Sequence, residues 1–128
     1  MSAFLTPLDV EELDADRWRL LTSLVYDSDL AGRLLVPAGF VTDLESIPRW
    51  VPFAYAVAKG TAKRAAVVHD WLYEQFGSPK DLDDDIFYEA MGVLGIGWLQ
   101  RHLMWEAVHV WGTPNYLKRQ ARARARLS

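Results

Sequence analysis

The sequence of 128 residues contains no cysteine, which excludes disulfide bonds, thiolate metal ligands and cysteine nucleophiles. It has no apolar run near the roughly 20 residues needed to span a bilayer, so we expect no transmembrane segment. Its first twelve residues lack the basic and apolar regions of a signal peptide, and we expect none. Apolar residues make up 51% of the chain, with six Trp, five Tyr and five Phe, which excludes a disordered chain and predicts one globular domain.

Basic side chains are scarce over most of the chain. Residues 1–117 hold 9 basic and 17 acidic side chains, a net charge of −8, whereas residues 118–128 hold 5 basic side chains and no acid. A body this acidic does not favour a nucleic-acid groove. We therefore divide the chain into a single α+β domain over 1–117 and a basic C-terminal tail over 118–128. We expect that tail to be solvated or to dock a partner, in preference to reading nucleic acid.

The order of turn and capping signals predicts strands first and helices afterwards. Gly77 is a typical helix stop, and Ser78-Pro79 is a typical helix start with Ser78 as the cap. The fold class that we expect is α+β, mainly α, with an N-terminal β-hairpin followed by a compact bundle of three to four helices. The expected elements are strands over 18–26 and 33–36, and helices over 61–76, 79–94, 98–111 and from 113 onward.

Two of these helices carry the residues of the one candidate chemical site. His69 lies in the middle of an apolar stripe on helix 61–76, in which apolar residues recur at spacings of three and four. On helix 79–94 the core face extends one turn back to Asp83 and Asp84. A carboxylate there costs several kcal/mol unless it is paired. We therefore expect His69 and Asp84 to face each other in the interior, with the carboxylate orienting the imidazole.

Three segments resemble a family of small bacteriophage and prophage proteins, the domain-of-unknown-function family 1353. They are Phe40-Val41-Thr42-Asp43-Leu44-Glu45-Ser46-Ile47-Pro48-Arg49, Ala65-Ala66-Val67-Val68-His69-Asp70-Trp71-Leu72-Tyr73 and Asp84-Asp85-Ile86-Phe87-Tyr88-Glu89-Ala90-Met91. The resemblance runs in this order from about residue 18 to residue 112. It implies a phage or prophage origin, in a tail or lysis gene neighbourhood, but no reaction. Glu45 departs from the small residue usual in the family.

A second, local resemblance concerns residues 65–73 alone. Their spacing is similar to the His-Asp helix of secreted, calcium-dependent phospholipases, with Ala, Ala and Leu at the cysteine positions. This resemblance implies that His69 activates water, that Asp70 binds calcium and that Asp84 orients His69. The Gly-rich calcium loop of that family is absent, so Asp43 and nearby carbonyl groups would have to replace it, since calcium takes six to eight oxygen ligands.

Two functions follow as hypotheses. The first is a structural protein of a phage particle, in its tail or neck, or an accessory to assembly or lysis. Its expected partners are other phage proteins and not nucleic acid, and binding to a membrane surface is left open. Its expected location is the virion or the cytoplasm of the infected host. The second is a metal-assisted hydrolase of the phospholipase type. In it His69 is the general base, Asp84 orients it, and Asp70 or Asp43 holds a divalent cation, calcium or zinc.

Each of these residues also has a purely structural role as an alternative. A buried His69–Asp84 pair can do no more than pin two helices together, and Asp43 can brace the turn after it. Thr42, Ser46, Arg49 and Tyr73 are assigned to a loop or wall of the site, where they bind a substrate or hold the structure. His102 and His109 lie about 10 Å apart along one helix, too far to share an ion, so we expect packing or surface roles.

Overall fold

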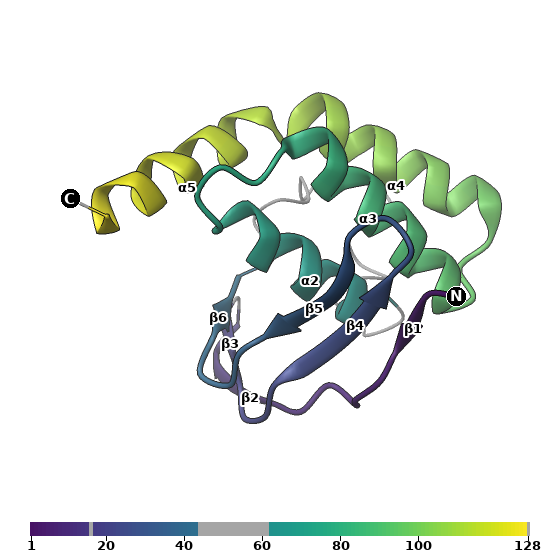
Figure 1. The fold of residues 1–128 in the computed structure, drawn as a ribbon, viewed down its shortest axis with the longest axis horizontal. Helices are drawn as coiled ribbons and strands as arrows, with labels where there is room; N and C mark the ends of the chain where they lie inside the picture. The colour runs from purple at the N-terminus through teal and green to yellow at the C-terminus, as the bar shows by residue number, and fades with distance from the viewer. Residues whose placement is uncertain (16, 44–61, 128) are drawn as a thin grey trace.

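The fold is described from a computed structural model, which describes residues 1–15, 17–43 and 62–127. In Figure 1 the strands lie together on one side of the molecule, and the two last helices run along the opposite edge. Over the described residues the order is six strands followed by four helices: β1 (Ala3–Phe4), β2 (Val10–Asp14), β3 (Arg17–Leu20), β4 (Leu24–Ser28), β5 (Gly32–Val36), β6 (Val41–Thr42), α2 (Lys63–Tyr73), α3 (Lys80–Val93), α4 (Trp98–Trp111) and α5 (Thr113–Arg126).

One sheet is built on the predicted hairpin. β4 and β5 pair antiparallel with Tyr26 opposite Leu34, and β1 pairs with the other edge of β4. Gly32 adopts φ +77°, a left-handed conformation that suits glycine in the tight connection. Alternate residues of β4 are buried, and the hydroxyl of Tyr26 donates a 2.6 Å hydrogen bond to Glu89 of α3. This sheet therefore packs its buried face toward the helices.

The prediction of a single strand over residues 18–26 is wrong, because these residues form two strands that belong to different sheets. The chain bends after Leu20, so β3 and β4 belong to different sheets, and β3 pairs antiparallel with β2 and β6. The bend is closed by backbone hydrogen bonds from Leu21 to Asp9 and from Gly39 to Leu20. The fold is thus α+β as expected, with strands first, but it has more sheet than one hairpin. The four helices hold about half of the described residues.

The first two helices form the centre of the core. Residues 65–70 of α2 are all buried, so this helix is enclosed on nearly every side, as its apolar sequence predicts. α3 packs against α2 and also contacts β1 and β4. The prediction that Ser78 caps α3 is wrong: Pro79 is the N-cap, and the Ser78 hydroxyl donates instead to Asp83 at 2.5 Å.

The last two helices begin where the sequence predicts them. α4 covers 98–111, the predicted bounds, and packs on α3, while α5 begins at Thr113 with Pro114 in its first turn. α5 continues without a break through Arg126, so it carries the basic residues 118–126, as the helix predicted from 113 onward implies. No helix in the described part of the chain is both long and apolar enough to cross a membrane.

Several expectations concern residues outside the described ranges. They are the roles of Ser46 and Arg49 in the site, the departure from the family at Glu45 and the start of the helix over 61–76 at residue 61.

Candidate functional site

His69 and Asp84 are in direct contact, as the sequence predicts. His69 Nε2 lies 2.7 Å from Asp84 Oδ1, and both side chains are 0% exposed. α2 supplies the imidazole and α3 the carboxylate, because both apolar faces turn into the same interface. The imidazole packs between the rings of Tyr73 and Phe87, with centroid distances of 4.2 and 4.8 Å. The pair is therefore sealed within the core.

Three further donors converge on the same carboxylate. The Tyr73 hydroxyl donates to Asp84 Oδ1 at 2.5 Å, and Lys80 Nζ donates to Oδ2 at 2.7 Å. His109 Nδ1, from α4, lies 3.2 Å from Oδ2. Each carboxylate oxygen thus has two partners, and the charge of Asp84 is balanced by the Lys80 ammonium. We refer to Asp84 with His69, Tyr73, Lys80 and His109 as the Asp84 cluster.

Lys80 links this cluster to the end of α4. Besides Asp84, its ammonium donates to the carbonyls of Val108 and His109 at 3.1 and 2.9 Å. The carbonyls of the last turn give the C-terminal end of a helix a partial negative charge, so a cation is favourable there. Sequence reasoning did not assign Lys80, although it lies four residues before Asp84 on one helix, the spacing at which such pairs form. Sequence reasoning also gave His109 a packing or surface role and did not predict its contact with Asp84.

The electrostatics of the cluster favour a charged Asp84 and a neutral His69. Burial by itself would raise the pKa of Asp84, but hydrogen bonds from His69, Lys80 and Tyr73 lower it to about 2. Burial lowers the pKa of His69, and Asp84 offsets this only in part. A neutral imidazole donates its Nε2 proton to the carboxylate, which can only accept. Asp84 thus pairs its charge with the Lys80 ammonium and not with His69.

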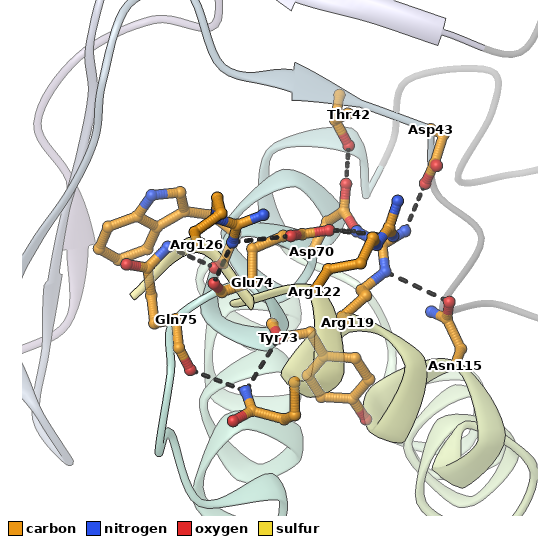
Figure 2. Close-up of polar contacts among 12 residues, drawn as sticks. Thr42, Asp43, Asp70, Tyr73, Glu74, Gln75, Asn115, Arg119, Arg122 and Arg126 are labelled. Atoms are coloured by element: carbon orange, nitrogen blue, oxygen red, sulfur yellow. Dashed lines mark hydrogen bonds and ion pairs between the residues drawn. The ribbon is translucent and has the colours of Figure 1, made fainter. Parts of the chain in front are cut away.

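A second polar cluster forms around Arg119, a residue that sequence reasoning placed in the solvated tail. Figure 2 shows its guanidinium among three carboxylates: it forms an ion pair with Asp70, contacts Asp43 at 2.5 Å and contacts Glu74 at 2.8 Å. Arg119 is 1% exposed and is one of the largest fully buried side chains. We call Arg119 with Asp43, Asp70 and Glu74 the Arg119 cluster. Arg119 is therefore buried against the rest of the chain, although it lies in the segment expected to be solvated or to dock a partner.

The remaining contacts of the Arg119 cluster fix its geometry. Thr42 donates from Oγ1 to Asp70 Oδ2 at 2.6 Å, and Arg119 Nε donates to Asn115 at 3.2 Å. Burial raises the pKa of Asp70 to about 7, although the charge of Arg119 opposes this rise. Burial alone would lower the pKa of Arg119, but Asp70 and Asp43 outweigh it and raise this pKa. The guanidinium therefore stays charged.

α5 is held to the end of α2 largely by polar contacts. Arg122 and Arg126 lie 3.3 and 3.4 Å from Glu74, on the same side of the helix as Arg119 (Figure 2). Gln120 donates to the carbonyls of Tyr73 and Gln75 at 3.1 and 2.7 Å. These partners explain why a strongly basic segment folds back onto an acidic body. The division of the chain into a domain and a tail at residue 117 stays a prediction.

The two clusters separate residues that the sequence placed in one site. His69 and Asp84 meet in the first cluster, with Tyr73, whereas Asp70, Asp43 and Thr42 meet in the second. The two carboxylates expected to bind a metal both contact the Arg119 guanidinium. Within the residues that the structure describes, no group of three or more His, Cys, Asp or Glu side chains is arranged to hold a metal ion.

Comparison with known proteins identifies a family that matches the chain. Residues 18–108 match the family described as "Protein of unknown function (DUF1353)", which is most of the chain. No curated protein and no solved structure matches the sequence. The matched range includes both helices of the His69–Asp84 pair and ends before α5, so Arg119 lies outside it. The chain belongs to the DUF1353 family of proteins of unknown function.

Proposed function

We propose that this chain is a non-catalytic protein of a bacteriophage, acting as a structural component of the tail or neck or as an accessory to assembly or lysis. In this proposal the Asp84 cluster is a structural device that holds α2, α3 and α4 together. The phage assignment rests on the sequence resemblance, and the location is the virion or the cytoplasm of the infected cell. The non-catalytic role rests on the burial of His69 and Asp84.

The observation that supports the non-catalytic role is that both carboxylate oxygens of Asp84 already have hydrogen-bond partners within the protein. Its carboxylate has four partners from three helices, and neither it nor His69 is exposed at all. A general base must come within hydrogen-bond reach of the water that it deprotonates. A buried pair whose polar atoms bond across helix interfaces favours a structural role, in which each contact stabilises helix packing.

A second candidate function is a hydrolase, and one observation favours it. The 2.7 Å contact between His69 Nε2 and Asp84 Oδ1 orients the imidazole and fixes its tautomer, as the phospholipase resemblance implies. The cation that this mechanism requires would have to displace Arg119 from Asp70 and Asp43. We therefore rank this function second.

The experiment that separates the two functions compares His69→Gln and His69→Ala with the wild type. Under the structural proposal, hydrolysis of short-chain esters and phospholipids stays at background for all three, with and without calcium. His69→Ala then lowers the free energy of unfolding by about 2–4 kcal/mol, because it leaves a cavity and removes one hydrogen-bond donor from the buried Asp84 carboxylate. Wild-type turnover that His69→Gln abolishes, while its circular dichroism is unchanged, would establish the hydrolase and refute the proposal.

A cation titration adds an independent readout. The melting temperature of the wild type and of Asp70→Asn is followed with added calcium and with added zinc. Because Arg119 already balances Asp70 and Asp43, we expect no shift in either protein. A rise for the wild type that Asp70→Asn loses would place a metal at Asp70 and support the hydrolase.

A further inference from the structure

The outer face of α4 is unusually apolar for a surface helix. Its core side consists of Met104, Ala107 and Val108, which are buried. On the opposite side four residues at spacings of 4, 3 and 4 form what we call the outer stripe: Leu99, Leu103, Glu106 and Val110. Its three apolar members are 59, 40 and 54% exposed. A helix that is apolar on both sides is normally covered on both.

The chemistry of this face argues against a lipid or nucleic-acid partner. Helices that lie on membranes carry Lys and Arg on their polar side, and nucleic-acid surfaces need basic side chains. α4 has one such residue, Arg101, and its guanidinium lies 4.8 Å from the Tyr88 ring on the α3 side. Glu106 is the charged residue of the outer stripe, and it is acidic. The face therefore fits a protein surface.

The stripe also has the pattern of a helix that pairs with a copy of itself. Spacings of 4, 3 and 4 are those of the a and d positions of a coiled coil, which form the seam between two helices. We propose that the outer stripe of α4 packs antiparallel against the same stripe of a second copy of this chain, across a two-fold axis. The inference goes beyond the proposed function and does not depend on it.

Charge complementarity selects the antiparallel orientation. In a parallel pair in register, Glu106 of each copy faces Glu106 of the other, and two like charges oppose each other. In an antiparallel pair centred between Leu103 and Glu106, Leu99 lies opposite Val110 and Glu106 opposite Leu103. Glu106 then also lies beside His102 of the second copy, while its own His102 is 3.9 Å away. Each carboxylate thereby gains a second imidazole neighbour.

The available area sets the expected strength of this contact. Trp98, which flanks the stripe, is 65% exposed, and a Trp side chain offers at most about 250 Å². The outer stripe and Trp98 offer far fewer residues than the roughly 20–30 a side of a standard interface. We therefore expect a dimer that dissociates on dilution, not an obligate one.

Sedimentation equilibrium of the full chain over a wide concentration range tests the proposal. The expected mass rises from 14.6 kDa toward twice that value as concentration increases. Leu99→Lys with Leu103→Lys should weaken association at least about a hundredfold, with an unchanged circular dichroism spectrum. The matched control is Leu30→Lys with Leu35→Lys, two leucines at the β4–β5 hairpin that are 52 and 48% exposed. It should dimerise like the wild type.

Cysteine cross-linking tests the orientation, because the chain contains no cysteine of its own. Leu99→Cys with Val110→Cys should give a disulfide-linked dimer. Leu99→Cys alone should not, because in the antiparallel pair its two copies lie about 16 Å apart along the helix, beyond disulfide reach. A monomer at all concentrations overturns the proposal. So does a cross-link through Leu99→Cys alone, or cosedimentation of a monomer with phosphatidylcholine vesicles.

Discussion

The buried carboxylate of Asp70, on α2, forms an ion pair with the guanidinium of Arg119, on α5, which is itself almost fully buried. Ion pairs removed from water are costly unless their remaining polar atoms are satisfied. Here Thr42, Asp43 and Glu74 complete the set of partners. The contact fastens the last helix to the centre of the fold.

Replacing Arg119 tests the importance of that contact for stability. Arg119→Met leaves Asp70 buried without its cation, so we expect the free energy of unfolding to fall by about 3–5 kcal/mol. Arg124→Met on the same helix is the control. Arg124 is exposed, and the change should stay within about 0.5 kcal/mol. Urea denaturation measures both. Equal effects of the two substitutions would show that the Arg119 cluster does not hold α5.

The pH dependence of stability tests the charge on Asp84. Its pKa is lowered from 3.8 to about 2 in the folded chain, so it contributes stability above pH 3.8 that is lost as pH falls through 2. The lost contribution is about 2 kcal/mol. We expect the wild type to lose more stability than Asp84→Asn between pH 5 and pH 2, measured by urea denaturation. Parallel curves for the two proteins would contradict a charged, stabilised Asp84.

Asp70 predicts the opposite slope in a different pH range. Its pKa is raised from 3.8 to about 7, so the folded chain binds this proton more tightly than the unfolded chain. The contribution of Asp70 is therefore most favourable below pH 3.8, and it declines as pH rises toward 7. The stability of the wild type relative to Asp70→Asn should fall between pH 4 and pH 7 and level off above. If the difference in free energy of unfolding between the two proteins stayed flat or rose over that interval, burial would not be the dominant influence on the pKa of Asp70.

Lys80 connects Asp84 to the end of α4, and its removal should affect both. Lys80→Met removes the ammonium from Asp84 and from the carbonyls of Val108 and His109. We expect a loss of about 2–4 kcal/mol in thermal or urea unfolding. Arg124→Met, at an exposed position of α5, is again the control and should change stability by no more than about 0.5 kcal/mol. A loss no larger for Lys80→Met than for Arg124→Met would refute this role.

The features that the sequence predicted correctly are those that depend on local sequence pattern. α4 has the predicted bounds, because its capping glycine and apolar spacing are local signals, and His69 meets Asp84 because each sits on the apolar stripe of its own helix. The strand over 18–26 was predicted as one because the segment contains no Gly, Pro, Asn or Asp to indicate a turn. The bend after Leu20 is set by hydrogen bonds to Asp9 and Phe40, which are distant in sequence.

The Arg119 cluster shows why the rest could not be predicted. The alternation of Arg and Ala in α5 spreads charge around the helix, and nothing local indicates which arginine is buried. Only the tertiary fold brings Asp43, Asp70 and Glu74 to one point, where a guanidinium satisfies all three. The sequence offered Asp70 or Asp43 as a ligand of a divalent cation, with a turn-bracing role as the alternative for Asp43. The cation present is a side chain more than forty residues away in the sequence.

The central claim is that His69 is a sealed, neutral donor to Asp84 and not a solvent-accessible base. Nuclear magnetic resonance of the ¹⁵N-labelled imidazole tests it directly, by following the His69 ring nitrogens and the Nε2 proton between pH 5 and pH 8. Because burial lowers the pKa of His69, we expect a neutral ring with a slowly exchanging Nε2 proton across this range. Titration near pH 6.5 with rapid proton exchange would contradict the claim.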